Sequence, residues 1–221
     1  MSVSTSPCEQ ASKLESARYA VIRRLGYVFR HHLVLNLQPL NMVCQVMHHR
    51  LSAVPVDIAA MRESVDQVER LVGASMDSCS EVVSWLTADA HATVALRVAI
   101  GECLSSVRSS FSFRGFVIRY EESYSDLPIS QVAVREVLMA ALITATDHAK
   151  GLSEIVVAVL PVSDGAEVAI QMCRGANESQ GEQNAYRLLD WDDVQALANY
   201  HGLGFLHTSS GLVKIRISRA S

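Results

Sequence analysis

Residues 56–87 read VDIAAMRESVDQVERLVGASMDSCSEVVSWLT, and they form the most regular pattern in the chain. Apolar or small side chains recur there at steps of three and four, with charged residues between them, at Ile58, Met61, Val65, Val68, Val72, Ser75 or Met76, Cys79, Val83 and Leu86. This spacing is typical of a long helix with a heptad-like seam that has one irregular step near its middle. The sequence therefore predicts a long helix over residues 56–87.

The preceding residues predict a second long helix, over residues 9–52. Its apolar residues, among them Leu14, Val21 and Leu25, also recur near helical spacing. The only breaker is Pro39, which is expected to kink the helix without ending it. Residues 52–55 form a short connection, and Pro55 is expected to open the next helix. Two long helices joined by a short loop predict an antiparallel hairpin.

A single hairpin of this kind leaves much of its apolar surface in contact with water. Two hairpins that pack together bury this surface as a four-helix bundle. The sequence therefore predicts a homodimer. The alternative is that the hairpin packs against the rest of its own chain.

The pattern changes after residue 89. Helices are expected over residues 92–111, 129–149 and about 190–200, and strands over residues 116–120, 154–160, 167–173, 205–208 and 212–217. The Ser163-Asp164-Gly165 turn predicts a β-hairpin, whereas Gly175 to Glu182 is expected to be a loop. The fold class is therefore α+β, with a helical hairpin followed by an α/β two-layer sandwich. We expect a flexible N-terminus (1–8), a hairpin domain (9–89) and an α/β domain (90–221).

Composition excludes several functional classes. The net charge of −4 gives no basic surface for a nucleic acid or an acidic membrane. No uncharged apolar run reaches the roughly 18 residues of a membrane span, and the first ten residues do not resemble a secretion signal. The five cysteines are widely spaced, without a CxxC pair, which argues against a disulfide framework or a zinc site. We expect a cytoplasmic protein, no nucleic-acid or membrane partner, and cysteines that are mostly buried.

Residues 29–37, FRHHLVLNL, resemble the phosphoacceptor box of sensor histidine kinases. In that family an exposed histidine is followed by an acidic residue and then by apolar positions. The resemblance makes His31 the phosphoacceptor, with His32 in the place of the acid and as the second choice for the acceptor. The order of elements from about residue 9 onward also resembles the family's core, a dimerisation and phosphotransfer hairpin followed by a Bergerat-type ATPase domain.

Two further stretches resemble parts of the family's nucleotide site but lack the residues that hold ATP. In residues 134–145, Ala140 and Thr144 stand where the family has its magnesium-binding asparagine, and alanine offers no oxygen ligand. After residues 168–172, Cys173 stands where the family reads adenine with an aspartate, followed by Arg174 and Gly175. Residues 184–194 contain no glycine for a phosphate-holding lid, and Asp190, Asp192 and Asp193 are expected to repel a triphosphate. These losses predict that ATP is not bound.

Helical projection places His31 on a flank of the apolar face and His32 near its middle, so His31 is expected to be the more exposed of the two. Arg24, Tyr27 and Gln38 lie close to His31 in angle. With Arg30, they are the residues expected to support or dock an incoming phosphoryl group. The His48-His49 pair resembles this pair but lacks its context. Asp147 and His148 are interpreted as polar residues near a helix end, and Trp191 and Phe205 as core residues.

The resemblance implies a histidine phosphotransferase in a two-component phosphorelay. Such a protein takes a phosphoryl group from one response-regulator receiver domain and returns it to another, without ATP. It needs no cofactor of its own, because the receiver supplies the magnesium, and its ATPase-like domain would help to dock the receiver. One alternative is a non-enzymatic adaptor that binds a receiver or a true histidine kinase and modulates it. Another is an ATP-dependent kinase with an unusual pocket.

Overall fold

The computed structural model describes residues 7–87, 92–121, 126–149, 153–174 and 187–218. The chain divides into two compact units. One contains Leu25–Ala88, and the other contains Met1–Arg24 together with Asp89–Ser221. Within the described part of the chain, no helix combines the length and the apolar character that crossing a membrane requires.

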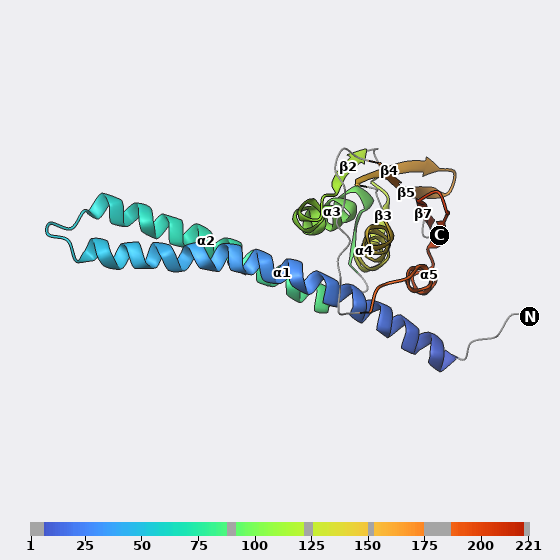
Figure 1. Cartoon of the computed structure of the whole chain (residues 1–221), viewed down its shortest axis with the longest axis horizontal. Coiled ribbons are helices and arrows are strands. Elements are labelled where there is room, and N and C mark those ends of the chain that lie inside the picture. Colours follow the sequence, from blue (N-terminus) through green and yellow to red (C-terminus); the bar gives the residue numbers. More distant parts are fainter. Residues whose placement is uncertain (1–6, 88–91, 122–125, 150–152, 175–186, 219–221) are drawn as a thin grey trace, which may run out of the picture. The chain divides into compact units, whose positions relative to one another are not determined.

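The first unit is the helical hairpin. Helix α1 spans Pro7–Leu51 and contains Pro39, and helix α2 spans Ile58–Leu86 (Figure 1). Asn36 in the middle of α1 donates to the carbonyl of Ala74 at 3.3 Å and lies 3.2 Å from the hydroxyl of Ser78. Near the loop, Arg50 donates to the carbonyl of Ala60 at 2.8 Å. Going away from the loop along α1, from Arg50 to Asn36, the contacts move along α2 from Ala60 to Ser78, as in the antiparallel hairpin that the sequence predicts.

The start of α2 differs from the expectation. The helix begins at Ile58, and Asp57 caps it by accepting a hydrogen bond from the backbone N–H of Ala60 at 3.0 Å. Pro55 therefore lies in the connection and does not open the helix. An aspartate can close the first turn with its side chain, which proline cannot do.

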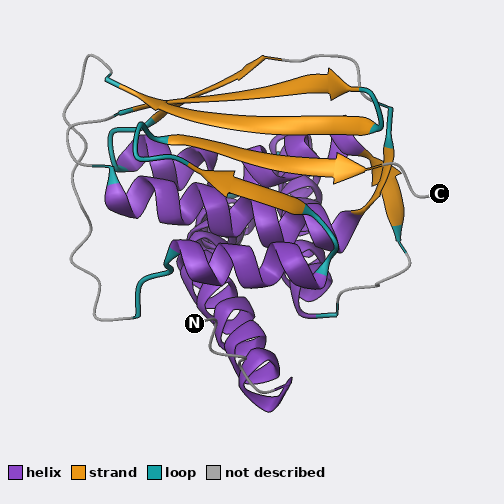
Figure 2. Cartoon of the chain, turned by 90° about the vertical axis from the view of Figure 1, so that its right-hand side faces the viewer, coloured by secondary structure: helices purple, strands orange, loops and turns teal. Residues whose placement is uncertain are grey.

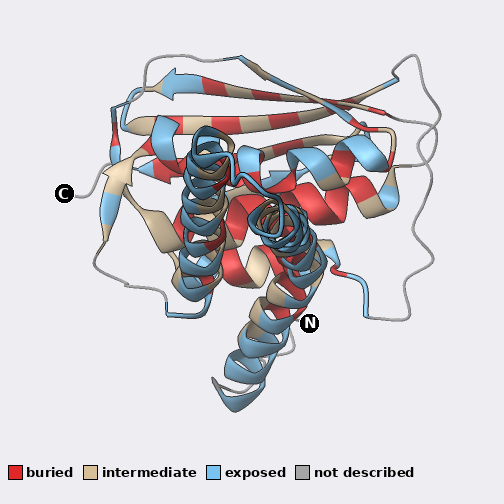
Figure 3. Cartoon of the chain, turned by 90° about the vertical axis from the view of Figure 1, so that its left-hand side faces the viewer, coloured by how far each residue is buried: buried red, intermediate tan, exposed pale blue. Residues whose placement is uncertain are grey.

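The apolar seam of α2 does not face α1. The buried residues of α2 are Ser64, Ser75 and Trp85, and Trp85 packs on Phe29 of α1 with ring centroids 6.4 Å apart. Apart from Ser75, the seam residues are exposed or half-buried in the single chain, which leaves the long helices mostly uncovered (Figure 3). The most exposed of them are Ile58, Met76, Val83 and Leu86.

The second unit is a two-layer α/β domain. Five strands form its sheet in the order β2-β4-β5-β7-β6, with β2 parallel to β4 and the other pairs antiparallel. Figure 2 shows the strands as one layer and the helices as the other. The bounds of the five strands are Val117–Glu121 (β2), Glu154–Val162 (β4), Gly165–Cys173 (β5), Gly204–His207 (β6) and Leu212–Ser218 (β7).

Helices α3 (Leu96–Phe113), α4 (Gln131–His148) and α5 (Trp191–Tyr200) form the second layer. Two short strands, β1 (Thr93–Ala95) and β3 (Pro128–Ser130), pair with each other just before α3 and α4. These strands are not evident in the sequence, because three residues are too few to show an alternating pattern. Helix α4 is buried from Ala133 to Thr146 at nearly every position and forms the centre of the core.

The first turns of α1 also belong to this unit. Ala17 and Val21 are buried, and Arg18 lies 3.0 Å from Glu136 of α4 in an ion pair. Ser16 accepts a hydrogen bond from Arg187 at 2.8 Å. The hairpin domain expected over residues 9–89 thus differs from the compact unit at its N-terminal end, because residues up to Arg24 pack on α4 and on the segment that leads into α5.

Candidate functional site

His31 lies on the part of α1 that belongs to the hairpin unit. Its side chain is exposed, and that of His32 is half-buried, in the order that helical projection predicts. The two ring centroids are 6.4 Å apart. Within the single chain, the imidazole of His31 is therefore accessible to a second molecule.

Two exposed residues lie within one helical turn before His31. The guanidinium carbon of Arg30 lies 5.6 Å from the centroid of the Tyr27 ring, within the range of a cation–π contact. Tyr27 is 54% exposed, and Arg30 is exposed as well. Gln38, the other polar residue expected on this flank, is also exposed. Three of the four predicted supporting residues are therefore on the surface of the hairpin.

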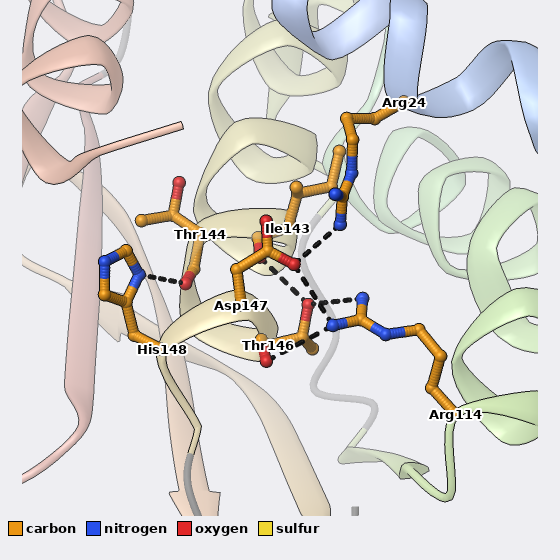
Figure 4. A network of polar contacts seen from close by, with 7 residues as sticks. All are labelled: Arg24, Arg114, Ile143, Thr144, Thr146, Asp147 and His148. Carbon is orange, nitrogen blue, oxygen red and sulfur yellow. Dashed lines mark hydrogen bonds and ion pairs between the residues drawn. The ribbon is translucent and has the colours of Figure 1, made fainter. Parts of the chain in front are cut away.

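Arg24 is the exception, and the structure corrects the expectation for it. Its side chain is only 11% exposed, and its Nη2 atom lies 2.6 Å from Oδ1 of Asp147 at the end of α4 (Figure 4). Because its guanidinium pairs with a buried carboxylate of the α/β unit, Arg24 is not presented to a phosphoryl group at His31. Helical projection cannot anticipate such a contact, because the partner lies 123 residues away in the sequence.

Asp147 is shared by a second arginine. Arg114 donates to the same Oδ1 atom at 3.1 Å and to the hydroxyl of Thr146 at 3.3 Å (Figure 4). The side chains of Asp147 and Arg114 are 3% and 6% exposed. Two buried guanidinium groups therefore depend on one carboxylate, and removing that carboxylate would leave both of them without a counter-charge. Asp147 lies near the end of α4, as interpreted from the sequence, but its carboxylate is buried in an ion-pair network that the sequence did not show.

The positions that match the family's nucleotide site do not fit a magnesium–nucleotide complex. Ala140 and Thr144 are both fully buried in α4. The hydroxyl of Thr144 has no hydrogen-bond partner within the described residues, and its carbonyl is 2.8 Å from Nδ1 of His148. The side chain of Ala140 has no oxygen to serve as a ligand, and the hydroxyl of Thr144 is fully buried, away from a hydrated cation.

The end of β5 also lacks a group that could read adenine. Cys173 is half-buried and Arg174 is exposed. The carbonyl of Cys173 accepts a hydrogen bond from the N–H of Ser153 at 3.1 Å, so this backbone continues the sheet. Gly175 and the expected loop from Gly175 to Glu182 lie outside the described residues.

The acidic residues before α5 have a structural role that the sequence analysis missed. Asp190 caps α5, and its side chain and that of Asp193 form a reciprocal capping box. Asp193 is fully buried and pairs with Arg187 at 2.7 Å. Asp193 therefore does not face solvent where it would repel a triphosphate, although Asp190 and Asp192 are exposed. Residues 184–186 of this glycine-free stretch lie outside the described residues.

Aromatic rings gather at the start of α5. Trp191 stacks on His207 of β6 with centroids 4.9 Å apart and an angle of 13° between the planes. His148 and Phe205 each lie 6.2 Å from the Trp191 ring. Trp191 and Phe205 are half-buried, so they form the margin of the core, and His148 and His207 are exposed.

The cysteines differ from the expectation of general burial. Cys8, Cys44 and Cys79 are exposed, Cys173 is half-buried, and only Cys103 is buried. Burial in α3 raises the pKa of the Cys103 thiol to about 12. The described residues contain no group of three or more His, Cys, Asp or Glu side chains that could hold a metal ion.

No protein-family model matches the chain, and no curated protein matches it. Among solved structures, it is similar to the histidine kinase AdeS of Acinetobacter baumannii (15% identity, TM-score 0.47, covering 83% of this chain and 98% of that one). A histidine kinase from Burkholderia phymatum STM815 has 16% identity and a TM-score of 0.45, with coverage of 90% and 99%. A bacterial phosphotransferase has 10% identity and a TM-score of 0.41, with coverage of 96% and 97%.

These neighbours are histidine kinases and a phosphotransferase. At these identities and TM-scores, the likeness says nothing about which reaction the chain performs.

Proposed function

We propose that this chain is a histidine phosphotransferase of a two-component phosphorelay, and that His31 carries the phosphoryl group between receiver domains. The observation that carries the proposal is the exposed imidazole of His31 on a long helical hairpin, with an exposed arginine directly before it. The fully buried Ala140 and Thr144 support a source of phosphate other than ATP.

The transfer step is a substitution at phosphorus. A neutral ring nitrogen of His31 attacks the phosphorus atom of an aspartyl phosphate on the receiver. The N–P bond forms while the P–O bond to the aspartyl carboxylate breaks, and this carboxylate leaves with the electron pair. The other ring nitrogen of His31 then releases its proton to water. The receiver supplies the magnesium ion, and transfer to a second receiver reverses these steps.

The exposed apolar residues of the hairpin support a homodimer. Ile58, Met76 and Leu86 are each more than 60% exposed in the single chain, as is Met42 of α1. Burying such side chains releases about 1.5–3 kcal/mol each, and a second hairpin offers a matching apolar surface. We expect light scattering to give the mass of two chains for the wild type. Met76→Glu should shift this mass toward one chain, whereas Glu63→Gln on the charged part of α2 should not. A wild type with the mass of one chain would contradict the dimer.

The test of function uses receiver domains from the same genome, each labelled on its aspartate. Label is expected to move to the wild type and to His32→Ala, but not to His31→Ala. Equal transfer to His31→Ala, or no transfer to the wild type from any receiver, would contradict the proposal. A His31→Gln variant that keeps its full biological effect would favour the non-enzymatic adaptor instead.

A further inference from the structure

We propose that Tyr27 and Arg30 form a positioned cation beside His31 that stabilises its phosphorylated form, with Tyr27 acting through Arg30. This inference rests on the proposed function, because it concerns the same histidine. It adds an equilibrium property, namely that the chain holds the phosphoryl group more firmly than an isolated surface histidine would.

The first argument comes from helix geometry. Side chains of an α-helix tilt toward its N-terminus, so Arg30 and His31 both extend toward the preceding turn. Tyr27 lies on this turn, three residues before Arg30 and four before His31, and residues at these spacings are neighbours on a helix surface. Tyr27 is therefore a neighbour of both Arg30 and His31 on the surface of α1.

The second argument is the contact between Tyr27 and Arg30. The guanidinium carbon lies 5.6 Å from the ring centroid, and the exposed faces of both side chains remain open to a partner. An arginine on a mobile side chain loses conformational entropy when it binds a phosphoryl group. The ring restricts the guanidinium before binding, so less entropy is lost on contact.

The third argument is charge. Residues 27–35, YVFRHHLVL, contain no Asp or Glu, so no carboxylate of this stretch of α1 opposes a phosphoryl group on His31. A phosphoryl group is doubly negative and offers three strong acceptor oxygens, for which an arginine fork is the best-matched donor in proteins. Arg30 thus favours phosphorylated over unmodified His31, and it shifts the exchange with an aspartyl phosphate toward His31.

A second arginine–tyrosine pair on α1, Arg23 with Tyr19, provides a matched control. Arg23 lies over the ring of Tyr19 at 5.7 Å and donates to its hydroxyl at 3.2 Å. Tyr19 is 61% exposed. Arg23 lies eight residues before His31, which is roughly 12 Å along a helix and beyond the roughly 8 Å screening length of physiological salt. Arg23→Ala removes the same charge and a similar contact without touching His31.

The experiment measures the end-point partition of label between a phosphorylated receiver and the full-length chain, at fixed pH and salt. Arg30→Ala should lower the fraction of label that is bound to His31 at the end-point. The equilibrium constant for transfer from the receiver to His31 should be roughly two- to fivefold smaller, the range that exposed charge pairs produce. Arg23→Ala should leave the constant unchanged. In about 1 M salt, where the screening length is roughly 3 Å, the difference between the wild type and Arg30→Ala should shrink.

The role of Tyr27 is tested by a double-mutant cycle. Tyr27→Leu should lower the same constant about twofold, as expected for an exposed cation–π contact, and Tyr27→Phe should restore it. In the Arg30→Ala background, Tyr27→Leu should have no further effect, because Tyr27 acts through Arg30.

The outcomes separate this inference from the proposed function. A wild type that takes no label contradicts the proposed function. A wild type that takes label, with Arg30→Ala and Arg23→Ala giving equal constants, overturns only this inference. A change in transfer rate without a change in the end-point also overturns it, since Arg30 would then serve docking alone.

Discussion

Asp147→Asn removes the charge on which two buried arginines depend, and we expect it to be the most damaging single substitution in the α/β unit. Oδ1 of Asp147 lies 2.6 Å from Arg24 and 3.1 Å from Arg114. Breaking a buried ion pair by removing one partner costs about 3–5 kcal/mol. The free energy of unfolding should fall by about that amount, out of the roughly 5–15 kcal/mol that holds a native domain together.

Thermal unfolding followed by circular dichroism measures this loss. In a chain of this size, 1 kcal/mol corresponds to about 2–4 °C, so the Tm should fall by roughly 6–20 °C. Asp164→Asn is the control, because it removes one partner of an ion pair of 2.9 Å that is exposed on both sides, and its Tm should fall far less than that of Asp147→Asn, since exposed pairs contribute little to stability.

A rescue variant tests the physical cause. Replacing Arg24, Arg114 and Asp147 together with Met, Met and Leu should recover much of the lost stability, since an apolar core avoids burying charges without counter-charges. An Asp147→Asn variant that melts with the wild type, or as little changed as the Asp164 control, would refute this account of the network.

Three further predictions concern the backbone and two kinds of titratable group. Gly165→Ala should destabilise the chain by more than about 1 kcal/mol, because a Cβ at this position would meet the backbone oxygen of Ile217. Gly101→Ala lies on open helix surface and should stabilise the chain by up to about 1 kcal/mol. Urea unfolding compares the two variants, and equal changes in the free energy of unfolding would contradict the packing at Gly165. With its pKa raised by burial to about 12, the Cys103 thiol has almost no thiolate at neutral pH. Mass spectrometry should therefore show alkylation of Cys103 only after unfolding, and of the exposed Cys8 before it. Rapid native labelling of Cys103 would contradict its burial. Hydrogen bonding to Arg216 lowers the pKa of Asp164 below its ordinary value of 3.8. The pair therefore stabilises the folded chain above pH 3.8, and this stabilisation is lost as the pH falls through the lowered pKa. NMR titration should find the ordinary pKa of Asp164 restored in Arg216→Gln, and an unchanged pKa in this variant would contradict the pairing.

The sequence predicts the two long helices and the order of the longer helices and strands along the chain well, because their patterns are repetitive. Many residues of α2 repeat the same spacing, so an error at one position does not change the prediction. The ends of helices depend on single residues, and the predicted start of α2 was less accurate. The cap at Asp57 carries a signal that could have been used, since aspartate before an apolar run is typical of a helix start.

The site was predictable only in part, for a geometric reason. The exposure of His31 and the partial burial of His32 follow from one helix and its angular spacing, which the sequence contains. The burial of Arg24 depends on its ion pair with Asp147, which lies 123 residues away in the sequence. A pattern along one helix carries no information on such a long-range contact.

The burial of the cysteines was also poorly predicted from the sequence. Composition statistics place cysteine among the most buried residue types, yet Cys44 and Cys79 lie on exposed positions of the long helices. Within the described part of the hairpin unit, α1 and α2 pack on each other along one side, so many of their other positions are exposed in the single chain. A second hairpin, as proposed for the dimer, would change the surroundings of such positions.

The central claim is that the phosphoryl group reaches position 31 from an aspartyl phosphate and not from ATP. Its most direct measurement gives the chain γ-labelled ATP in one reaction and a labelled cognate receiver in another, and maps the label by mass spectrometry under conditions that preserve phosphohistidine. We expect label on His31 from the receiver and none from ATP. Label on His31 from ATP alone, or label from the receiver on a residue other than His31, would contradict the account.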